Sequence, residues 1–415
     1  MLTIKNYLVH TFEFAENSSY CDGNLQVSRK ELDAYCLNGI EDITVSFEIA
    51  RPGESVRILH VTDTVMPSWK EGGSTFPGWS DGEDFCGSGK RHQLVGVAVM
   101  GSSVWPGIQE AIIEMSGEGA KYCPFSETMN LVISILPQKK EIEKAKLAKQ
   151  LNQIVLRAAE FLGKLTEGIR EDSEEMYCEI DSESDSELPV VGYFCYIQAQ
   201  GPLRNVHIKG RNCTDMKPVL LKPEELLDGG IVSGNYIIAC QKNPTFFHQC
   251  NPVVMNMLER HRKDLIFRNV IVSTESGLLE KKRENAVLAA KLAKENGMDG
   301  IVISQEGGGH ADVDLMFAAE ECEKLGIKTV LLTNELAGPN GDLPPLVASS
   351  PVADAIVTNG NNDEVITLQP TERAIGGTNI QGGKFDAVGE LVTPLGIMYT
   401  ATNQLGVGKM CTVAL

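Results

Sequence analysis

Residues 268–358 alternate between short apolar runs and longer amphipathic stretches, and this alternation limits the fold more than any other feature. Runs of strand length occupy residues 268–274, 300–304, 328–333 and 354–358, and stretches with the period of a helix occupy 280–296 and 312–325. Strands that alternate with helices are joined by right-handed crossovers, so they lie parallel in a sheet that helices cover on both faces. Residues 189–415 are therefore predicted to form a three-layer α/β domain with a mostly parallel sheet.

The first part of the chain has a different pattern. Residues 43–50 and 55–61 alternate between apolar and polar side chains, with a Pro-Gly turn between them. The apolar residues of 139–162 recur with the period of one long helix. Residues 1–170 are therefore predicted to form a β-rich N-terminal domain that ends in a long helix. Residues 171–188 hold nine acidic side chains and few apolar ones, which predicts an exposed loop or linker.

The composition excludes several classes of protein. No apolar run approaches the ~20 residues needed to cross a bilayer, so we expect no membrane span. The formal net charge of −19 leaves no basic face for nucleic acid. The eleven cysteines are an odd number without a CxxC pair, which argues against a disulfide framework and a structural zinc site. Together with the absence of a signal-peptide pattern, they predict a cytoplasmic protein with reduced thiols.

Open parallel sheets bind ligands at the carboxyl ends of their strands, where loops and helix N-termini meet. This rule selects a polar set of residues, namely Ser273, Thr274, Glu275, Gln305, Glu306, Gly307, Gly308, Gly309, His310, Asn334, Glu335 and Asn359 to Asn362. Glu306 and His310 are the candidates for catalysis, because a carboxyl group or an imidazole can transfer a proton. The candidates for substrate binding are Glu275, Gln305, Asn334 and Glu335.

Two neighbouring segments leave alternatives open. The amides of Gly307 to Gly309 precede a predicted helix, so they form either a site for a carboxylate or phosphate or a plain flexible turn. His310, Asp312 and Asp314 are of metal-binding types, yet acids in the first turn of a helix are also expected from its dipole, and we predict no metal. Neither GxGxxG nor GxxxxGK[ST] occurs, so a standard dinucleotide or nucleoside triphosphate site is not indicated.

Several longer stretches resemble one known family. They are residues 50–57, 107–117, 122–131, 228–235, 239–245, 304–307 and 401–406. Each is similar to the component B proprotein (alpha and beta subunits) of the glycine, sarcosine and betaine reductases. The similarity runs from about residue 40 through the rest of the sequence.

The resemblance implies an activity. In that family, which serves amino-acid fermentation, an amine-containing two-carbon acid is reductively cleaved. Its carboxymethyl group passes to a selenocysteine, and acetyl phosphate forms on another component. This chain contains no selenocysteine. By resemblance, the selenium belongs to a selenoprotein partner subunit of component B and to component A, components A and C complete the complex, and this chain binds the substrate.

One position departs from the family pattern. Glycine-type proproteins read Ser-Gly-Asn-Cys and are cleaved at the Asn-Cys bond, which converts the Cys into a pyruvoyl group. The matching residues here are 233–236, with Tyr236 in place of the Cys. A phenol held on a rigid ring cannot attack the preceding carbonyl, so we expect no pyruvoyl group and no other cofactor in this chain. Self-cleavage at Cys213 or Cys240 is the alternative.

The same departure bears on the substrate. A ketone activates an amine through an iminium, which requires a nitrogen with a lone pair. Glycine has such a nitrogen, whereas glycine betaine has a quaternary one that is already a leaving group. Proteins hold quaternary ammonium groups with aromatic faces. The candidates for such a cage are Tyr236, Phe246, Phe247, Trp69, Trp79 and Trp105. Asn235 and Cys240 are further substrate-binding candidates, and the betaine carboxylate is expected at Gly307 to Gly309.

We therefore predict the uncleaved component B alpha subunit of a betaine reductase, an oxidoreductase subunit that cleaves a C–N bond and releases trimethylamine with the help of a selenoprotein partner. The alternatives are a subunit for glycine, sarcosine or another methylated amine, and a non-catalytic scaffold paralogue without a pyruvoyl group.

Overall fold

A computed structural model describes residues 1–80, 86–104, 110–139, 143–177, 187–199, 205–234 and 241–406. Its largest sheet has six strands, in the spatial order β17 (Val219–Leu221), β19 (Ile266–Thr274), β14 (Val190–Ile197), β20 (Gly300–Ser304), β21 (Lys328–Glu335) and β22 (Ile356–Asn361). Strands β19, β14, β20, β21 and β22 are parallel, and β17 is antiparallel to β19. The predicted mostly parallel sheet is confirmed.

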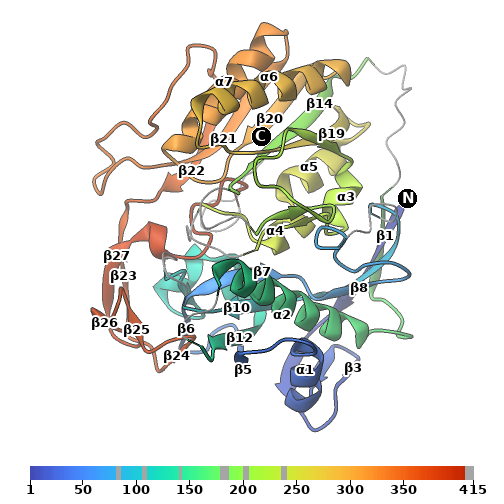
Figure 1. Ribbon diagram of the computed structural model, residues 1–415, viewed down its shortest axis with the longest axis vertical. Coiled ribbons are helices and arrows are strands. Elements are labelled where there is room, and N and C mark those ends of the chain that lie inside the picture. The colour runs from blue at the N-terminus through green and yellow to red at the C-terminus, as the bar shows by residue number, and fades with distance from the viewer. Residues whose placement is uncertain are drawn as a thin grey trace.

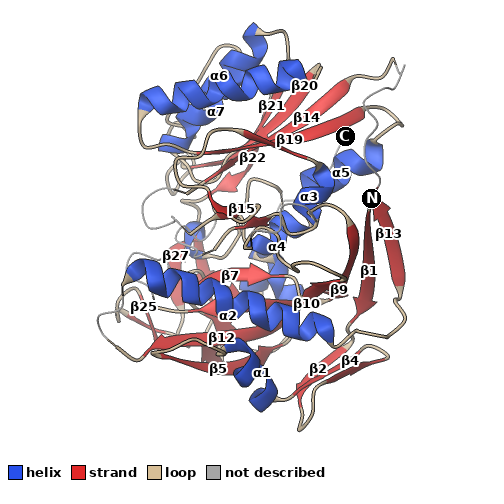
Figure 2. Ribbon diagram, turned by 45° about the vertical axis from the view of Figure 1, so that its right-hand side comes forward, coloured by secondary structure: helices blue, strands red, loops and turns tan. Residues whose placement is uncertain are grey.

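Helices cover the two faces of this sheet unequally. They are α5 (Pro252–Arg260), α6 (Leu279–Glu295) and α7 (His310–Lys324). The short helices α3 (Pro223–Leu227) and α4 (Thr245–Gln249) contact each other, and α4 also contacts β7 and β18 of other sheets. Figure 2 shows α6 and α7 side by side on one face and α5 on the other. On the α5 side, Val330 of β21 and Val357 of β22 are 39% and 41% exposed. The expected three layers are therefore complete only over part of the sheet.

The first half of the chain forms separate mixed sheets. One has the order β5 (Ile43–Ala50), β12 (Met129–Pro137), β10 (Val97–Ser102) and β7 (Val61–Val65), and another has β13 (Ser173–Tyr177), β1 (Leu2–Leu8), β9 (Gly89–Val95) and β8 (Ser68–Lys70). Smaller elements are β2 (Thr11–Phe14), β3 (Ser19–Cys21), β4 (Asn24–Val27), α1 (Arg29–Cys36), η2 (Glu118–Tyr122) and η3 (Pro124–Glu127).

The long helix predicted over 139–162 is α2, Lys144–Lys164. Its apolar stripe, which includes Leu151, Val155 and Leu162, is buried in the core of this half. Figure 1 shows α2 lying across the lower part of the molecule. The single strand expected over 55–61 is two strands, β6 (Val56–Ile58) and β7, because His60 between them has a φ of 55° that ends the extended backbone.

The acidic stretch 171–188 differs from the predicted loop. Residues Ser173–Tyr177 form β13, which pairs antiparallel with β1 at the edge of a sheet. Side chains on an exposed edge strand need not be apolar, so the composition does not reveal the strand. Residues 178–186 of the same stretch lie outside the described residues.

The C-terminal segment extends from the large sheet to the first half of the chain. Its strands are β23 (Val365–Leu368), β24 (Arg373–Ile375), β25 (Asn379–Ile380), β26 (Phe385–Asp386) and β27 (Leu391–Pro394), followed by η5 (Leu395–Ile397). Strand β24 pairs parallel with β6, which also pairs with β11 (Ile113–Glu114). A further small sheet contains β16 (Arg211–Asn212), β15 (His207–Ile208) and β18 (Ile231–Val232). Strands β6 and β24, which lie on opposite sides of residue 189 in the sequence, thus share a sheet. The domain boundary near residue 189 stays a prediction.

Arg57 fastens this C-terminal segment to β6. The side chain is fully buried, and its Nε donates to Glu114 Oε1 at 2.5 Å. Its other nitrogens donate to the carbonyl oxygens of Ala387, Gly389 and Gln369 at 2.8–2.9 Å. A buried cation is tolerated because a carboxylate and three carbonyls replace its water.

We expect Arg57→Ala to lower the free energy of unfolding by about 3–5 kcal/mol, because Glu114 is left as a buried charge without its cation. Urea denaturation followed by circular dichroism measures the change. Arg373→Ala is the matched control, since Arg373 also joins β24 to the first half of the chain but is 43% exposed. A loss for Arg57→Ala no larger than that of the control would contradict this account of the contact.

Candidate functional site

Polar side chains converge where the parallel strands of the large sheet end. Gln198 follows β14, Glu275 follows β19, and Gln305 and Glu306 follow β20. All four are buried. The apolar strands hold these residues in register, because each strand passes through the core and becomes polar only at its carboxyl end. We call this group, together with the residues it bonds to from 241–249 and 399–405, the strand-end cluster.

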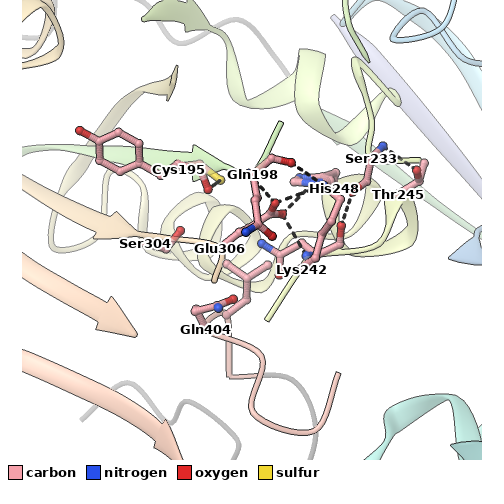
Figure 3. A network of polar contacts seen from close by, with 12 residues as sticks. Cys195, Gln198, Ser233, Lys242, Thr245, His248, Ser304, Glu306 and Gln404 are labelled. Carbon is pink, nitrogen blue, oxygen red and sulfur yellow. Dashed lines mark hydrogen bonds and ion pairs between the residues drawn. The ribbon is translucent and has the colours of Figure 1, made fainter. Parts of the chain in front are cut away.

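Glu306 lies at the centre of the strand-end cluster (Figure 3). Its Oε2 lies 3.3 Å from Lys242 Nζ and accepts a hydrogen bond from Gln198 N at 2.8 Å, and its Oε1 accepts one from Asn243 N at 2.9 Å. Lys242 Nζ also donates to the carbonyl of Gln198 at 3.2 Å. Both charged side chains are fully buried. Burial raises the pKa of Glu306, and the ammonium of Lys242 opposes that shift.

His248 of α4 lies against the same carboxylate. Its Nε2 is 3.8 Å from Glu306 Oε1, which is too long for a hydrogen bond. Burial, and next the positive charge of Lys242, lower the pKa of His248 to about 3. The imidazole is therefore neutral at physiological pH, with one nitrogen as a donor and the other as an acceptor.

Further charges lie behind Glu306. Glu275 Oε1 accepts a hydrogen bond from the backbone of Glu306 at 3.2 Å, and Lys282 of α6 pairs with Asp314 of α7. Burial, followed by the charges of Asp314 and Glu306, holds the pKa of Glu275 well above its ordinary value.

The segment that precedes residues 235–240 is fixed to the first half of the chain. Ser233 donates through its backbone N to Thr245 Oγ1 at 2.9 Å and through its hydroxyl to the carbonyl of Asn243 at 2.5 Å. The backbone N and hydroxyl of Thr245 donate to the two carboxylate oxygens of Asp63 in β7, at 2.9 and 2.7 Å. This chain of bonds anchors Ser233 on one side of 235–240 and Asn243 and Thr245 on the other.

Residues 399–405 form the remaining wall. Gln404 Nε2 donates to the carbonyl of Gln241 at 2.9 Å, and Asn403 donates to the side chain of Asn243. Asn359, at the end of β22, donates to the carbonyl of Gln404 at 2.6 Å. The carboxyl ends of the strands, the segment 241–249 and the segment 399–405 therefore meet at one place.

Several polar atoms of the strand-end cluster have no hydrogen-bond partner within the described part of the chain. They are both ring nitrogens of His248, Oε1 of Gln198, Gln305 and Gln404, Nδ2 of Asn243, Oε2 of Glu275 and Oδ1 of Asn334. A buried donor or acceptor left without a partner costs about 1–3 kcal/mol. Such a concentration at one sheet edge is typical of a site built to bind a polar ligand rather than of a core built for stability.

The structure brings together five of the predicted binding residues at the sheet edge. Gln305 Nε2 donates to Asp312 Oδ1 at 2.7 Å and to Thr333 Oγ1 at 3.0 Å, and Asn334 Nδ2 donates to the carbonyl of Thr402 at 3.5 Å. Glu275 lies beside Glu306, as described above. Glu335 accepts a hydrogen bond from Thr358, and Gly308 lies beside Asn334.

The loop Gly307 to Gly309 makes the turn from β20 into α7. Gly307 and Gly309 have φ values of 84° and 70°, which favour glycine because a side chain would be strained there. The backbone N of Gly307 donates to the carbonyl of Gln241 at 3.1 Å. That amide is therefore already occupied, which leaves Gly308 and Gly309 as the predicted anion donors.

Other predicted residues lie elsewhere. His310 is the first residue of α7 and is exposed, unlike the fully buried Glu306. The ring of Phe247 stacks on Phe125, with 5.3 Å between centroids, and Phe246 meets Phe125 edge-on at 5.2 Å. The structure thus places both phenylalanines in a packed aromatic core. Asn235, Tyr236 and Cys240 lie outside the described residues.

The strand-end rule missed Lys242, His248 and Gln404. None of them follows a strand of the large sheet, so no local pattern connects them with Glu306. A signal was nevertheless present for two of them, because residues 239–245 and 401–406 are among the stretches that resemble the reductase family.

The described residues contain neither a metal-binding group nor a helix that could span a membrane. No group of three or more His, Cys, Asp or Glu side chains among them is arranged to hold a metal ion. Asp312 and Asp314, considered above as metal ligands, are engaged by Gln305 and Lys282. Within the same described residues, none of the helices combines the length and the apolar character that a membrane crossing requires.

The low pKa of His248 predicts a pH dependence of stability. A pKa of about 3 in the folded state against 6.5 as the ordinary value means that the unfolded state binds more protons between these pH values. For each pH unit below 6.5, the free energy of unfolding of wild type should therefore fall by about 1.4 kcal/mol more than that of His248→Gln. Urea denaturation from pH 7 to pH 4 measures both, with the exposed His10 in a His10→Gln control. Parallel curves for wild type and His248→Gln would contradict the assignment.

Comparison with known proteins agrees with the resemblance drawn from the motifs. The family model described as glycine/sarcosine/betaine reductase component B subunits matches residues 1–412. A glycine reductase complex component B, subunits alpha and beta, from Peptoclostridium acidaminophilum is 37% identical, over 99% of this chain and 98% of the relative. From the same organism, a sarcosine reductase complex component B subunit alpha is 34% identical over 90% and 89%, and a betaine reductase complex component B subunit alpha is 34% identical over 90% and 87%. No solved structure matches significantly. The chain belongs to the family of glycine, sarcosine and betaine reductase component B subunits.

Proposed function

We propose that this chain is an uncleaved, substrate-binding component B subunit that acts on glycine betaine. The observation that carries the proposal is Tyr236, which stands where the glycine-type pattern has the pyruvoyl-forming Cys. Tyrosine has no aliphatic hydroxyl or thiol next to the preceding carbonyl, so the residue present does not fit a pyruvoyl group. A substrate that needs no iminium is therefore favoured, and a quaternary amine is such a substrate.

The identities of the relatives do not choose between substrates, because they lie at 37%, 34% and 34% for the glycine, sarcosine and betaine proteins.

The proposed reaction needs a nucleophile from outside this chain. A selenolate of a partner selenoprotein subunit attacks the methylene carbon of betaine, a Se–C bond forms, the C–N bond breaks, and its electron pair leaves with the nitrogen as neutral trimethylamine. The carboxymethyl group then passes to components A and C in the cytoplasm. Reduction by a dithiol and addition of phosphate would give acetyl phosphate there.

This chain's own contribution is to bind and orient the substrate. The carboxylate of betaine needs N–H donors, and the strand-end cluster supplies the cation of Lys242 and the neutral imidazole of His248. Glu306 holds Lys242 in place, and because its carboxylate already accepts two backbone hydrogen bonds, it is a positioning group rather than a proton donor. The amine departs as a neutral molecule, so this step requires no general acid.

A non-catalytic scaffold is the second candidate. It would have no need of polar atoms in the strand-end cluster that lack a partner among the described residues, because such atoms lower stability unless a ligand or another part of the chain bonds to them. Their presence favours a binding subunit over a scaffold.

Mass spectrometry under denaturing conditions tests the missing pyruvoyl group. We expect wild type to give one species at 45.1 kDa that does not react with a carbonyl probe. Tyr236→Cys restores the nucleophile and should yield two fragments, one with a carbonyl, whereas Tyr236→Ala should remain intact. Fragments from wild type would contradict the proposal and favour a glycine-type or sarcosine-type substrate.

Thermal unfolding with added ligand tests the substrate. A ligand that binds only the native state raises the stability by RT ln(1 + [L]/Kd), so betaine should raise the melting temperature more than sarcosine or glycine at equal concentration. Tyr236→Ala should weaken betaine binding by about 2-fold to 30-fold, while Tyr236→Phe keeps the aromatic face and the affinity. If none of the three ligands shifts wild type, the scaffold is favoured. Unchanged affinity in Tyr236→Ala would remove Tyr236 from the site.

A further inference from the structure

A cavity adjoins the strand-end cluster. It has a volume of about 450 Å³ and lies between the ends of β21 and β22 on one side and the segment that contains β25, β27 and η5 on the other. The described residues that line it include Glu110, Gln241, Leu336, Asp363, Thr393 and Ile397. The volume lies within the usual range for small-molecule sites.

The charged side chains that line this cavity are both acidic. Glu110 Oε1 accepts a hydrogen bond from the backbone N of Gln381 at 2.7 Å, and Asp363 Oδ2 accepts one from the backbone N of Gly338 at 2.9 Å. One oxygen of each carboxylate is thus held by a backbone N–H group. No Lys, Arg or His is among the described lining residues. Outside the lining, burial lowers the pKa of His60, and the nearby charge of Glu110 opposes that shift.

One wall carries an independent sign of a ligand. Thr393 of β27 is 2% exposed, and its Oγ1 has no hydrogen-bond partner in the described part of the chain. Thr393 lines the cavity together with the apolar side chains of Leu336, Pro394 and Ile397. Two carboxylates favour a positively charged ligand, and the apolar side chains beside them favour methyl groups on that ligand.

The cavity and the strand-end cluster share residues. Gln241 lines the cavity, while its carbonyl accepts hydrogen bonds from Gly307 N and Gln404 Nε2. A Cβ added to Gly308 would lie 3.0 Å from Leu336 Cδ1 and 3.4 Å from Gln241 Nε2. The anionic cavity is therefore a direct neighbour of the cluster that contains Lys242 and His248.

From this arrangement we infer that the cavity lined by Glu110 and Asp363 binds a small methylated ammonium cation. The inference rests on the proposed function for its choice of ligand, since the cation is either the ammonium end of the bound substrate or the amine released from it and protonated in water. In both cases the ligand has the same chemistry, namely a positive nitrogen surrounded by methyl groups.

Isothermal titration calorimetry with tetramethylammonium chloride tests the inference, with sodium chloride at equal ionic strength as the blank. Wild type should bind the cation. Glu110→Gln and Asp363→Asn should each weaken binding at least about fivefold, because each removes one unit of opposite charge near the nitrogen. The matched control is Glu390→Gln, which removes an exposed acid of the same C-terminal segment outside the cavity. Unfolding curves check that all variants are folded.

Absence of binding to wild type, or equal affinity in wild type and both cavity variants, would overturn the inference. Titration with betaine separates the two sources of the cation. Weaker betaine binding in Glu110→Gln would place the ammonium end of the substrate in the cavity, and unchanged betaine binding with weaker tetramethylammonium binding would identify it as a site for the released amine. Betaine binding without tetramethylammonium binding would overturn this inference alone. The reverse result would support the cavity and remove betaine as the substrate.

Discussion

The burial of Glu306 with Lys242 is the interaction on which the arrangement of the site depends. Removing a carboxylate and an ammonium from water costs several kcal/mol for each ion, and their attraction offsets this only when further hydrogen bonds complete both groups. Those bonds come from Gln198 after β14 and from the backbone of Asn243. The pair is therefore stable only when the sheet edge and the segment 241–249 are both in place, and Asp63 extends this requirement to the first half of the chain through Thr245.

The sequence predicted the strands, helices and strand-end residues, because these depend on residues that lie close together in the chain. The periods of the apolar residues identified β19, β20, β21, α6 and α7, and the rule for parallel sheets then identified Glu275, Gln305, Glu306 and Asn334. Contacts between distant segments left no such pattern. Lys242 and Glu306 are 64 positions apart, and Gln241 and Gln404 are 163 apart. Likewise, β13 has an exposed polar surface and β24 is three residues long, so neither has a periodicity from which its pairing could be read.

The two neighbouring polar regions differ in their charged groups. The strand-end cluster contains the ammonium of Lys242, paired with Glu306, and a neutral imidazole, whereas the described charged side chains of the cavity are two carboxylates beside apolar walls. An amino acid or a betaine is itself a carboxylate joined to a positive nitrogen by one carbon atom. Under the proposed function, its carboxylate would meet Lys242 and His248 and its nitrogen would meet the cavity, with Gln241 and Gly308 between the two regions.

The way the strands are shared between distant parts of the chain determines what a break in the backbone would do. A cut between residues 235 and 236 would leave β14 on one piece and its two neighbours, β19 and β20, on the other. Strand β6 and its partner β24 would be divided in the same way. Neither piece could dissociate without breaking the backbone hydrogen bonds of a sheet, so the cleaved protein would remain one folded particle. In this fold, the number of polypeptides and the number of folded bodies are independent of each other.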